Sequence, residues 1–225
     1  MKKTVFISSF FAIAALSATP FCHWDFDKGD IGKGYTVSTN GKYKFFGTTL
    51  PGFKGKGLKL DGQKRFSTSF PVAAEWKSFT FEMKFKLDNG VDKKSGNALL
   101  CYGKHSWNRS QFVLKITPRS QLEARFTQDA RKNELVLASK IIPFEKGKFY
   151  TVRVASQDGG ALKIWLDGEL VAIREKESWG MNRLVRKSPQ GYPLLTFGND
   201  LCDIFRVCRP LNGTADDIKI WNSFK

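Results

Sequence analysis

The chain has 225 residues, and its 37 Lys and Arg residues against 21 Asp and Glu residues give a formal net charge of +16 at pH 7. Such a charge attracts polyanions, which include acidic polysaccharides, anionic cell surfaces and nucleic acid. The basic residues are scattered along the sequence, so a solvated basic surface is the alternative. With two histidines and no Cys-x-x-Cys motif, the composition excludes a structural zinc site of the usual kind.

The N-terminus has the three-part layout of a secretory signal peptide. Lys2 and Lys3 precede an apolar run over residues 5–16, and small residues follow up to Ala18. The run is shorter than the roughly 20 residues that a transmembrane helix needs. We therefore predict a signal peptide over residues 1–18 and a secreted protein, either extracellular or periplasmic.

The mature chain, residues 19–225, contains no second long apolar segment, so we expect no transmembrane segment in it. No Pro-, Gly- or Ser-rich linker interrupts it, which favours one domain over two small ones. Loss of Lys2 and Lys3 lowers the net charge by two, from +16 to +14. Export makes an acidic polysaccharide or an anionic cell surface a better partner than nucleic acid.

Four cysteines remain after the predicted cleavage, and an exported protein can form disulfides. Cys202 and Cys208 bracket a short segment, and a bond between them would stabilise the chain by about 2 kcal/mol through loop entropy. Cys22 and Cys101 would then pair with each other or remain thiols, and the apolar run around Cys101 is typical of a buried thiol. Phe21 precedes Cys22 where a lipoprotein signal needs a small residue, so we do not expect lipid attachment.

Hydrophobic and polar residues alternate along most of the chain, and helical periodicity is almost absent. Residues 79–87 (FTFEMKFKL) place an apolar side chain at every odd position. Residues 150–156, 161–167 and 169–173 are separated by turns rich in Gly and Asp and predict a three-stranded meander. Further strands are expected at residues 57–61, 98–102, 111–117, 121–127, 135–139, 194–198 and 215–221. Short strands without intervening helices predict an antiparallel sandwich or barrel.

Several segments spread over the mature chain have the sequence motifs of a strand followed by a turn. They are residues 23–29 (HWDFDKG), 55–62 (GKGLKLDG), 78–83 (SFTFEM), 162–171 (LKIWLDGELV) and 216–222 (DDIKIWN). In this order they resemble the laminin-G-like branch of the concanavalin A-like lectin and glucanase superfamily. The resemblance implies an all-β fold, an antiparallel β-sandwich of the concanavalin A-like jelly-roll type. It leaves the function open, because such sandwiches include binding modules, hydrolases, lyases and spacers.

Sugar binding requires exposed aromatic rings that stack on pyranose faces, with polar groups beside them. Trp107, Trp179 and Tyr192 lie in loop-like stretches of the sequence. Loops on a rigid scaffold are where binding residues collect, so these three are the candidate glycan-binding residues. The alternative is that they pack the loops onto the sandwich. Tryptophans within strand motifs are interpreted as structural, and they are Trp24, Trp165 and Trp221.

A glycan-active enzyme is the second hypothesis. The Glu-x-Asp-x-x-Glu motif of the superfamily's glucanases is missing, and Glu175 and Glu177 lie among basic residues, which indicates a solvated turn. A lyase on acidic polysaccharide needs cations that neutralise a carboxylate and a Tyr or His that moves protons. The residues to test first are Tyr102, His105, Lys115 and Arg125. A third hypothesis is a structural domain that binds protein partners.

Calcium is common in the superfamily that the sequence resembles, and its ligands include a carboxylate just before the last strand. Asp216 occupies the matching position, and carbonyl groups near residues 27–30 could add further oxygen ligands. A turn residue at a strand end is the alternative role for Asp216. The sequence as a whole predicts an exported, non-catalytic carbohydrate-binding or adhesive module for an anionic glycan or cell-surface polymer.

Overall fold

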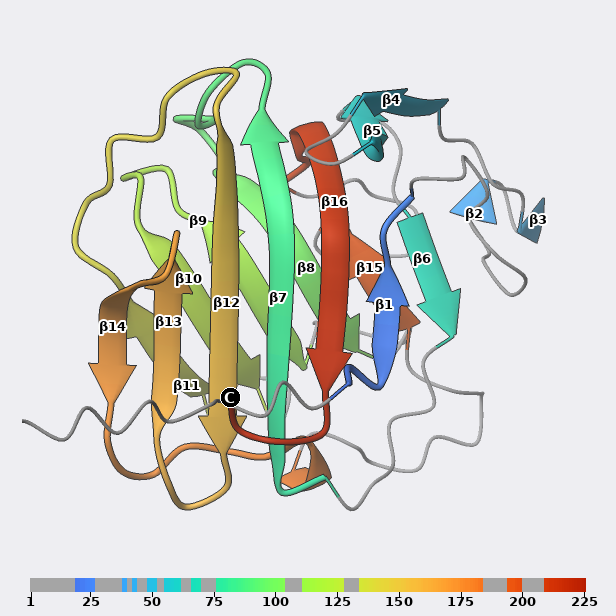
Figure 1. The fold of residues 1–225 in the computed structure, drawn as a ribbon. Coiled ribbons are helices and arrows are strands. Elements are labelled where there is room, and N and C mark those ends of the chain that lie inside the picture. Colours follow the sequence, from blue (N-terminus) through green and yellow to red (C-terminus); the bar gives the residue numbers. More distant parts are fainter. Residues whose placement is uncertain are drawn as a thin grey trace, which may run out of the picture.

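The computed structural model shows an all-β protein with two antiparallel sheets packed face to face (Figure 1), which confirms the predicted sandwich. It describes residues 19–26, 38–39, 42–43, 48–51, 55–61, 66–69, 76–103, 111–127, 134–183, 194–199 and 209–225. The predicted leader lies outside the described residues, and so do His105 and the candidates Trp107, Tyr192, Cys202 and Cys208.

The eight-stranded sheet lies at the front of Figure 1 in the order β14-β13-β12-β7-β16-β5-β4, with β1 also paired to β16. Its strands are β1 (Cys22–Trp24), β4 (Thr48–Pro51), β5 (Lys56–Asp61), β7 (Ser78–Leu87), β12 (Phe149–Gln157), β13 (Leu162–Leu166), β14 (Glu169–Arg174) and β16 (Asn212–Trp221). The predicted meander is β12, β13 and β14. Its last turn has Asp167 at φ 50° and Gly168 at φ 88°, as a tight hairpin requires.

The six-stranded sheet lies behind the first, in the order β11-β10-β9-β8-β15-β6. Its strands are β6 (Phe66–Ser69), β8 (Asn97–Gly103), β9 (Phe112–Ile116), β10 (Leu122–Thr127), β11 (Glu134–Ala138) and β15 (Leu194–Phe197). A separate short pair consists of β2 (Ser38–Thr39) and β3 (Lys42–Tyr43), and a single 3-10 turn, η1 (Met181–Arg183), completes the described elements. Within the described ranges, no helix has the length and apolar character to cross a bilayer.

Aromatic side chains fill the space between the sheets. β7 points Phe79, Phe81 and Phe85 inward at every second position, and each is at most 1% exposed. Phe81 stacks on Phe112 of β9, with ring centroids 5.4 Å apart and ring planes at 19°. Burial of such rings is the main favourable term in folding, so it decides which side of β7 is inside. The charged residues between them are left on the outer side of the sheet.

The last strand, β16, lies in the interior of its sheet between β7 and β5. Its pairing with β7 is interrupted by a bulge between Asp216 and Lys219. Inside the bulge Asp217 has a φ of 47°, a conformation that Asp and Asn adopt more readily than most residues. Bulges commonly re-aim a side chain, and this one directs Asp217 toward charged residues on the outer side of the sheet.

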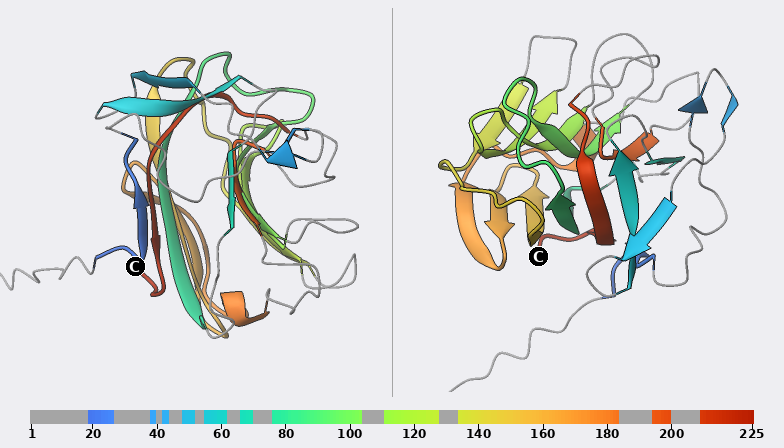
Figure 2. Two further views of the ribbon diagram at one scale, coloured as in Figure 1. Left: turned by 90° about the vertical axis from the view of Figure 1, so that its right-hand side faces the viewer. Right: turned by 90° about the horizontal axis from the view of Figure 1, so that it is seen from above.

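The six-stranded sheet is curved, and its hollow side faces away from the eight-stranded sheet (Figure 2, left). Along β9, Phe112, Leu114 and Ile116 belong to the core. Because side chains alternate along a strand, Val113 and Lys115 point to the hollow side. We call this side the concave face, and we call the exposed side of the eight-stranded sheet the outer face.

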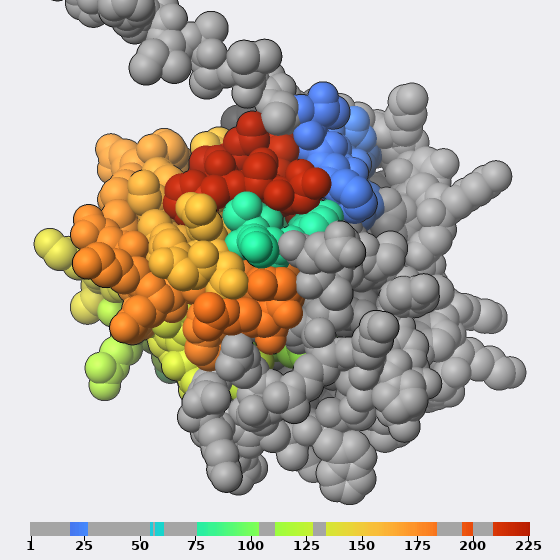
Figure 3. All heavy atoms as spheres, turned by 90° about the horizontal axis from the view of Figure 1, so that it is seen from below, coloured from blue at the N-terminus to red at the C-terminus, as the bar shows by residue number. Residues whose placement is uncertain are grey.

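The C-terminal residues fold back over the lower part of the outer face, where they appear in red beside the start of β7 and the end of β12 (Figure 3). The Oγ1 of Thr80 donates to the carbonyl oxygen of Ser223 at 2.8 Å, and the amide of Lys225 donates to the same Oγ1 at 3.0 Å. The Nζ of Lys163 lies 5.6 Å from the ring centroid of Phe224. This segment therefore borders the part of the outer face that stays open above it.

Cys22 and Cys101 lie in opposite sheets, in β1 and β8. Both are thiols in the structure, which decides between the two alternatives that the sequence left open for this pair. Cys101 is fully buried, in agreement with its apolar surroundings in the sequence. Burial raises the pKa of the Cys22 thiol.

Candidate functional site

A row of side chains crosses the concave face from β15 to β11. The pairing registers align, in order, Thr196, Cys101, Val113, Arg125 and Val136. Thr196, Cys101 and Val113 are buried although they point away from the core. Arg125 and Val136 are partly exposed. The open part of the concave face therefore lies over β10 and β11.

Four charged residues form the polar centre of this face, and we call them the concave-face cluster: Lys115, Glu123, Arg125 and Glu134. The Nζ of Lys115 lies 2.8 Å from Oε1 of Glu123, its Cα partner on β10. The Nε and Nη2 of Arg125 each lie 3.1 Å from the same oxygen. The Nη1 of Arg125 lies 3.7 Å from Oε2 of Glu134. Two carboxylates thus fix one guanidinium at the open end of the face.

Burial and neighbouring charges act on the Lys115 end of the cluster. Burial lowers the pKa of the Lys115 ammonium, and the hydrogen bond to Glu123 opposes that effect without cancelling it. Arg209 and Arg125 act in the same direction as burial, so Arg209 is a further cation near Lys115. The side chain of Arg125 is 34% exposed. Its N–H groups are placed to donate hydrogen bonds to oxygen atoms of a ligand.

The structure brings Lys115 and Arg125 together but turns Tyr102 away from them. Tyr102 points into the core and is fully buried. Burial raises the pKa of its phenol far above the ordinary value, and its hydroxyl has no hydrogen-bond partner among the described residues. A phenol on the opposite side of the sheet cannot move protons beside these two cations. The described members of the predicted lyase set therefore do not share one site.

Trp179 lies at the edge of the sandwich, between β14 and η1. It is partly buried and packs against the core, with its ring edge-on to Phe126 of β10 at a centroid distance of 6.4 Å. Its carbonyl oxygen accepts a hydrogen bond from Ser156 Oγ at 2.8 Å. These contacts fit the packing alternative for Trp179. The glycan-binding role of Trp107, Trp179 and Tyr192 stays a prediction.

Asp216, the candidate calcium ligand, is fully buried, and its Oδ1 accepts a hydrogen bond from the amide of Asp217 at 2.8 Å. In the part of the chain that the structure describes, no three His, Cys, Asp or Glu side chains are grouped as metal ligands. Residues 27–30, which the sequence suggested as a source of further ligands, lie outside that part. Calcium binding at Asp216 stays a prediction.

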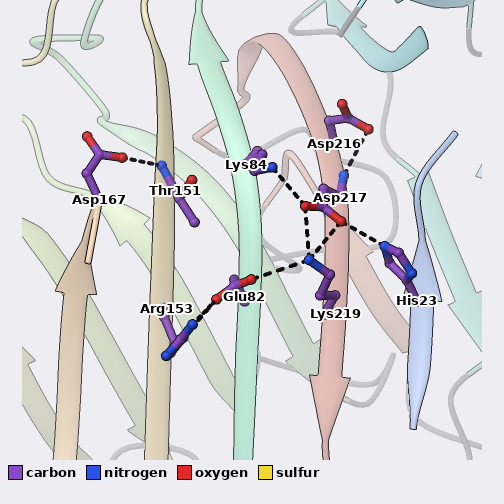
Figure 4. Close-up of polar contacts among 9 residues, drawn as sticks. All are labelled: His23, Glu82, Lys84, Thr151, Arg153, Asp167, Asp216, Asp217 and Lys219. Atoms are coloured by element: carbon purple, nitrogen blue, oxygen red, sulfur yellow. Dashed lines mark hydrogen bonds and ion pairs between the residues drawn. The ribbon is translucent and has the colours of Figure 1, made fainter. Parts of the chain in front are cut away.

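A second polar cluster lies on the outer face, and sequence reasoning missed it (Figure 4). The Oδ1 of Asp217 lies 2.7 Å from Nε2 of His23 and 2.9 Å from Nζ of Lys219. Its Oδ2 lies 2.9 Å from Nζ of Lys84. We call these four residues the Asp217 network. Burial alone would raise the pKa of Asp217, but hydrogen bonds from Lys84, Lys219 and His23 outweigh burial and hold that pKa well below its ordinary value.

Glu82 and Arg153 continue this network toward the centre of the sheet (Figure 4). The Oε2 of Glu82 accepts from Nε of Arg153 at 2.8 Å and lies 2.6 Å from its Nη2. The Oε1 of Glu82 lies 3.6 Å from Nζ of Lys219. The alternation in residues 79–87 already places Glu82 on the outer face. Its partners come from β12 and β16, so no local signal could have assembled the group.

Trp165 also lies on the outer face. Its neighbours Ile164 and Leu166 are core residues. Trp165 therefore points outward, aligned with Arg153 on one side and Leu170 on the other. Trp24, in contrast, packs against the core, where its ring is edge-on to Phe197 at 5.8 Å.

No protein-family model matches the sequence, and no curated protein matches it. Solved structures match its fold. The CBM40 module of a Ruminococcus gnavus IT-sialidase is 15% identical, with a TM-score of 0.57 over 80% of this chain and 91% of that chain. The same module bound to α2,3-sialyllactose is 16% identical, with a TM-score of 0.54 over 66% of this chain and 77% of that chain.

Domain 4 of a GH43 extracellular arabinanase from Geobacillus stearothermophilus, in complex with arabinotriose, is also similar. It is 15% identical, with a TM-score of 0.55 over 92% of this chain and 93% of that chain. At these identities the likeness shows the fold alone, a β-sandwich of two antiparallel sheets. The laminin-G-like branch itself stays an expectation.

Proposed function

We propose that the protein is a non-catalytic carbohydrate-binding module whose ligand lies on the open part of the concave face, over Arg125. The observation that carries the proposal is the concave-face cluster, in which Glu123 and Glu134 hold a partly exposed guanidinium on the hollow side of the sandwich. Guanidinium donors and carboxylate acceptors are the groups that hold sugar hydroxyls and carboxylates. The similar CBM40 and arabinanase domains, solved with sugars, support the proposal.

We propose further that the ligand is an anionic glycan or cell-surface polymer and that the mature protein acts outside the cytoplasm. The formal charge of +16 supports an anionic ligand, as does the electrostatic effect of Arg209 on Lys115. The predicted leader supports export, and the similar arabinanase is extracellular.

The segments that carry Trp107 and Tyr192 join the concave sheet at the end where Arg125 lies. Residues 104–110 connect β8 to β9, and residues 184–193 lead into β15. The registers align Leu194 with Gly103 and Phe112 with Tyr102, so these strand ends share one edge of the sheet. Phe112 is also the partner of Phe126, next to Arg125. The ends of these strands therefore support keeping Trp107 and Tyr192 as the proposed stacking residues.

A glycan array followed by titration calorimetry tests the proposal, with each binding glycan measured at low and at high salt. Arg125→Gln should weaken binding about tenfold or more, because it removes a charge-assisted hydrogen bond. Arg174→Gln is the matched control. Arg174 is the last residue of β14, away from the concave face. Its side chain is 40% exposed and pairs with Glu177. Trp107→Ala and Tyr192→Ala should weaken the same ligand.

Salt should weaken binding of an anionic glycan, because ions screen partly exposed charges. Failure of the wild type to bind any glycan on the array would contradict the carbohydrate-binding proposal. Equal affinity of the Arg125→Gln and Arg174→Gln variants would contradict the placement of the site.

A further inference from the structure

A continuous row of side chains crosses the outer face of the eight-stranded sheet. The pairing registers align, in order, His23, Lys219, Glu82, Arg153, Trp165 and Leu170. The row passes from β1 to β14 through β16, β7, β12 and β13, which stand side by side in Figure 1. Because neighbouring strands are about 4.8 Å apart, Lys219 and Arg153, two strands apart, lie about 10 Å from each other.

The carboxylates of this row lie deeper than its cations. The side chains of Asp217 and Glu82 are 4% and 11% exposed. Those of Lys219 and Arg153 are 22% and 43% exposed. Each carboxylate therefore fixes cationic groups whose outer surfaces remain open to solvent. The face presents positive charge at defined positions, although the network beneath it is nearly neutral.

An aromatic platform lies next to these cations. Trp165 is partly exposed and aligned with Arg153, and the exposed side chain of Leu170 extends the apolar surface on its other side. Lys163, two residues before Trp165 and on the same face, lies over the ring of Phe224. An indole beside a guanidinium offers a flat surface for a pyranose ring and a donor for its carboxylate.

We propose that the outer face is a second binding surface, which holds a linear acidic polysaccharide across β16, β7, β12 and β13. Carboxylates of the polysaccharide pair with Arg153 and Lys219, and one sugar ring stacks on Trp165. This surface lies on the opposite side of the sandwich from Arg125, so it does not depend on the concave-face site. Two such faces would let one molecule crosslink, or bind with avidity to, a polymer on a cell surface.

The spacing of charges favours a polysaccharide over nucleic acid and over a membrane. A nucleic acid strand carries one phosphate per about 3.4 Å, so it would set phosphates against Glu82 as well as against the cations. A polysaccharide with fewer charges places hydroxyl donors there instead. A membrane surface would need several apolar side chains among the cations, whereas Trp165 is the single large apolar side chain beside a cation in this row and Leu170 lies at its end.

Affinity electrophoresis in gels that contain hyaluronan, with dextran as the neutral polymer, tests the proposal. The measurement is made in the Arg125→Gln background, so that the concave face does not contribute. Adding Arg153→Gln or Trp165→Leu should each weaken retention by hyaluronan about tenfold, while Trp165→Phe, which keeps a ring, should weaken it less. Adding Arg174→Gln is the control and should leave retention unchanged.

Equal retention of the background and the Trp165→Leu variant would overturn the proposal, and so would retention by dextran equal to that by hyaluronan. Tighter binding to single-stranded DNA, or to phosphatidylglycerol vesicles, than to hyaluronan would overturn it in favour of those ligands. Thermal unfolding of each variant confirms that the fold is intact. If Arg153→Gln unfolds, the retention of Arg153→Lys, which keeps the positive charge, tests whether position 153 contributes to binding. Because every variant carries Arg125→Gln, retention by hyaluronan reports the outer face even if the concave face binds no glycan.

Discussion

The Nε2 of His23 lies 2.7 Å from Oδ1 of Asp217, although the two residues are 194 positions apart in the sequence. An ionised carboxylate only accepts hydrogen bonds, so His23 carries a proton on Nε2. The contact joins β1, the first of the described strands, to β16, the last of them, at the bulge in β16. It belongs to the Asp217 network, whose energetic role can be measured.

Asp217→Asn should lower the free energy of unfolding by about 2 kcal/mol at pH 7, because it removes the negative charge that the partly exposed Lys84, Lys219 and His23 contact. Asn tolerates the positive φ at this position, so the effect reports the charge. Urea denaturation measures it. Glu177→Gln, at an exposed pair with Arg174, is the control and should change little.

The effect of Asp217→Asn should depend on pH with a defined sign. The folded state holds the pKa of Asp217 below the ordinary value of 3.8, so the ionised carboxylate stabilises the fold above that value. This stabilisation is lost as the pH falls from about 5 toward the folded-state pKa. The difference between wild type and variant should therefore shrink from pH 5 to pH 2. A difference that stays constant over this range would contradict the assignment.

Gly96→Ala should destabilise the fold more than Gly147→Ala. Both glycines have a positive φ, 72° and 78°, so alanine at either position costs about 1 kcal/mol of backbone strain. At Gly96 the added Cβ would also lie 2.2 Å from the carbonyl oxygen of Ile116, whereas at Gly147 nothing lies within 4 Å. Overpacking raises the expected cost at Gly96 to about 3 kcal/mol. Equal midpoints in urea would contradict the close approach of backbone seen at Gly96.

The exported protein should contain two thiols and one disulfide. Cys22 and Cys101 should react with a thiol reagent after denaturation, and in the native state Cys101 should be protected by burial. Cys202 and Cys208 should be joined, and their reduction should lower the free energy of unfolding by about 2 kcal/mol. Peptide mapping by mass spectrometry checks both statements. Four reactive thiols in the denatured exported protein would contradict the disulfide.

The exported protein should begin at Thr19, after removal of residues 1–18. N-terminal sequencing of protein from the medium or periplasm measures this directly. Replacing Lys2 and Lys3 by Glu should reduce export, because the leader needs its positive start. Recovery of the protein with Met1 intact from outside the cell would contradict the predicted cleavage.

The alternation of residue types predicted the fold well because each strand of a sandwich carries its own burial pattern. The expected strands at residues 98–102 and 121–127 correspond to β8 (Asn97–Gly103) and β10 (Leu122–Thr127). The same rule indicates that Trp165 points outward, since it alternates with Ile164 and Leu166.

The clusters on the two faces could not be predicted, because they depend on which strands become neighbours. Lys115 was a candidate for its charge, but only the register of β9 with β10 places it opposite Glu123. Asp216 was a candidate because the resemblance implies a calcium-binding carboxylate near the last strand, whereas the bulge brings the adjacent Asp217 to the charged network. Such contacts are set by long-range pairing, which leaves no periodic trace in the sequence.

The place of β16 between β7 and β5 bears on the order of events in the cell. The eight-stranded sheet cannot close until residues 212–221 have been synthesised, because both halves hydrogen-bond to that strand. A nascent chain that lacks this strand has no complete core to trap it in a compact state. The topology thus postpones compaction of the sandwich until the last strand has joined its sheet.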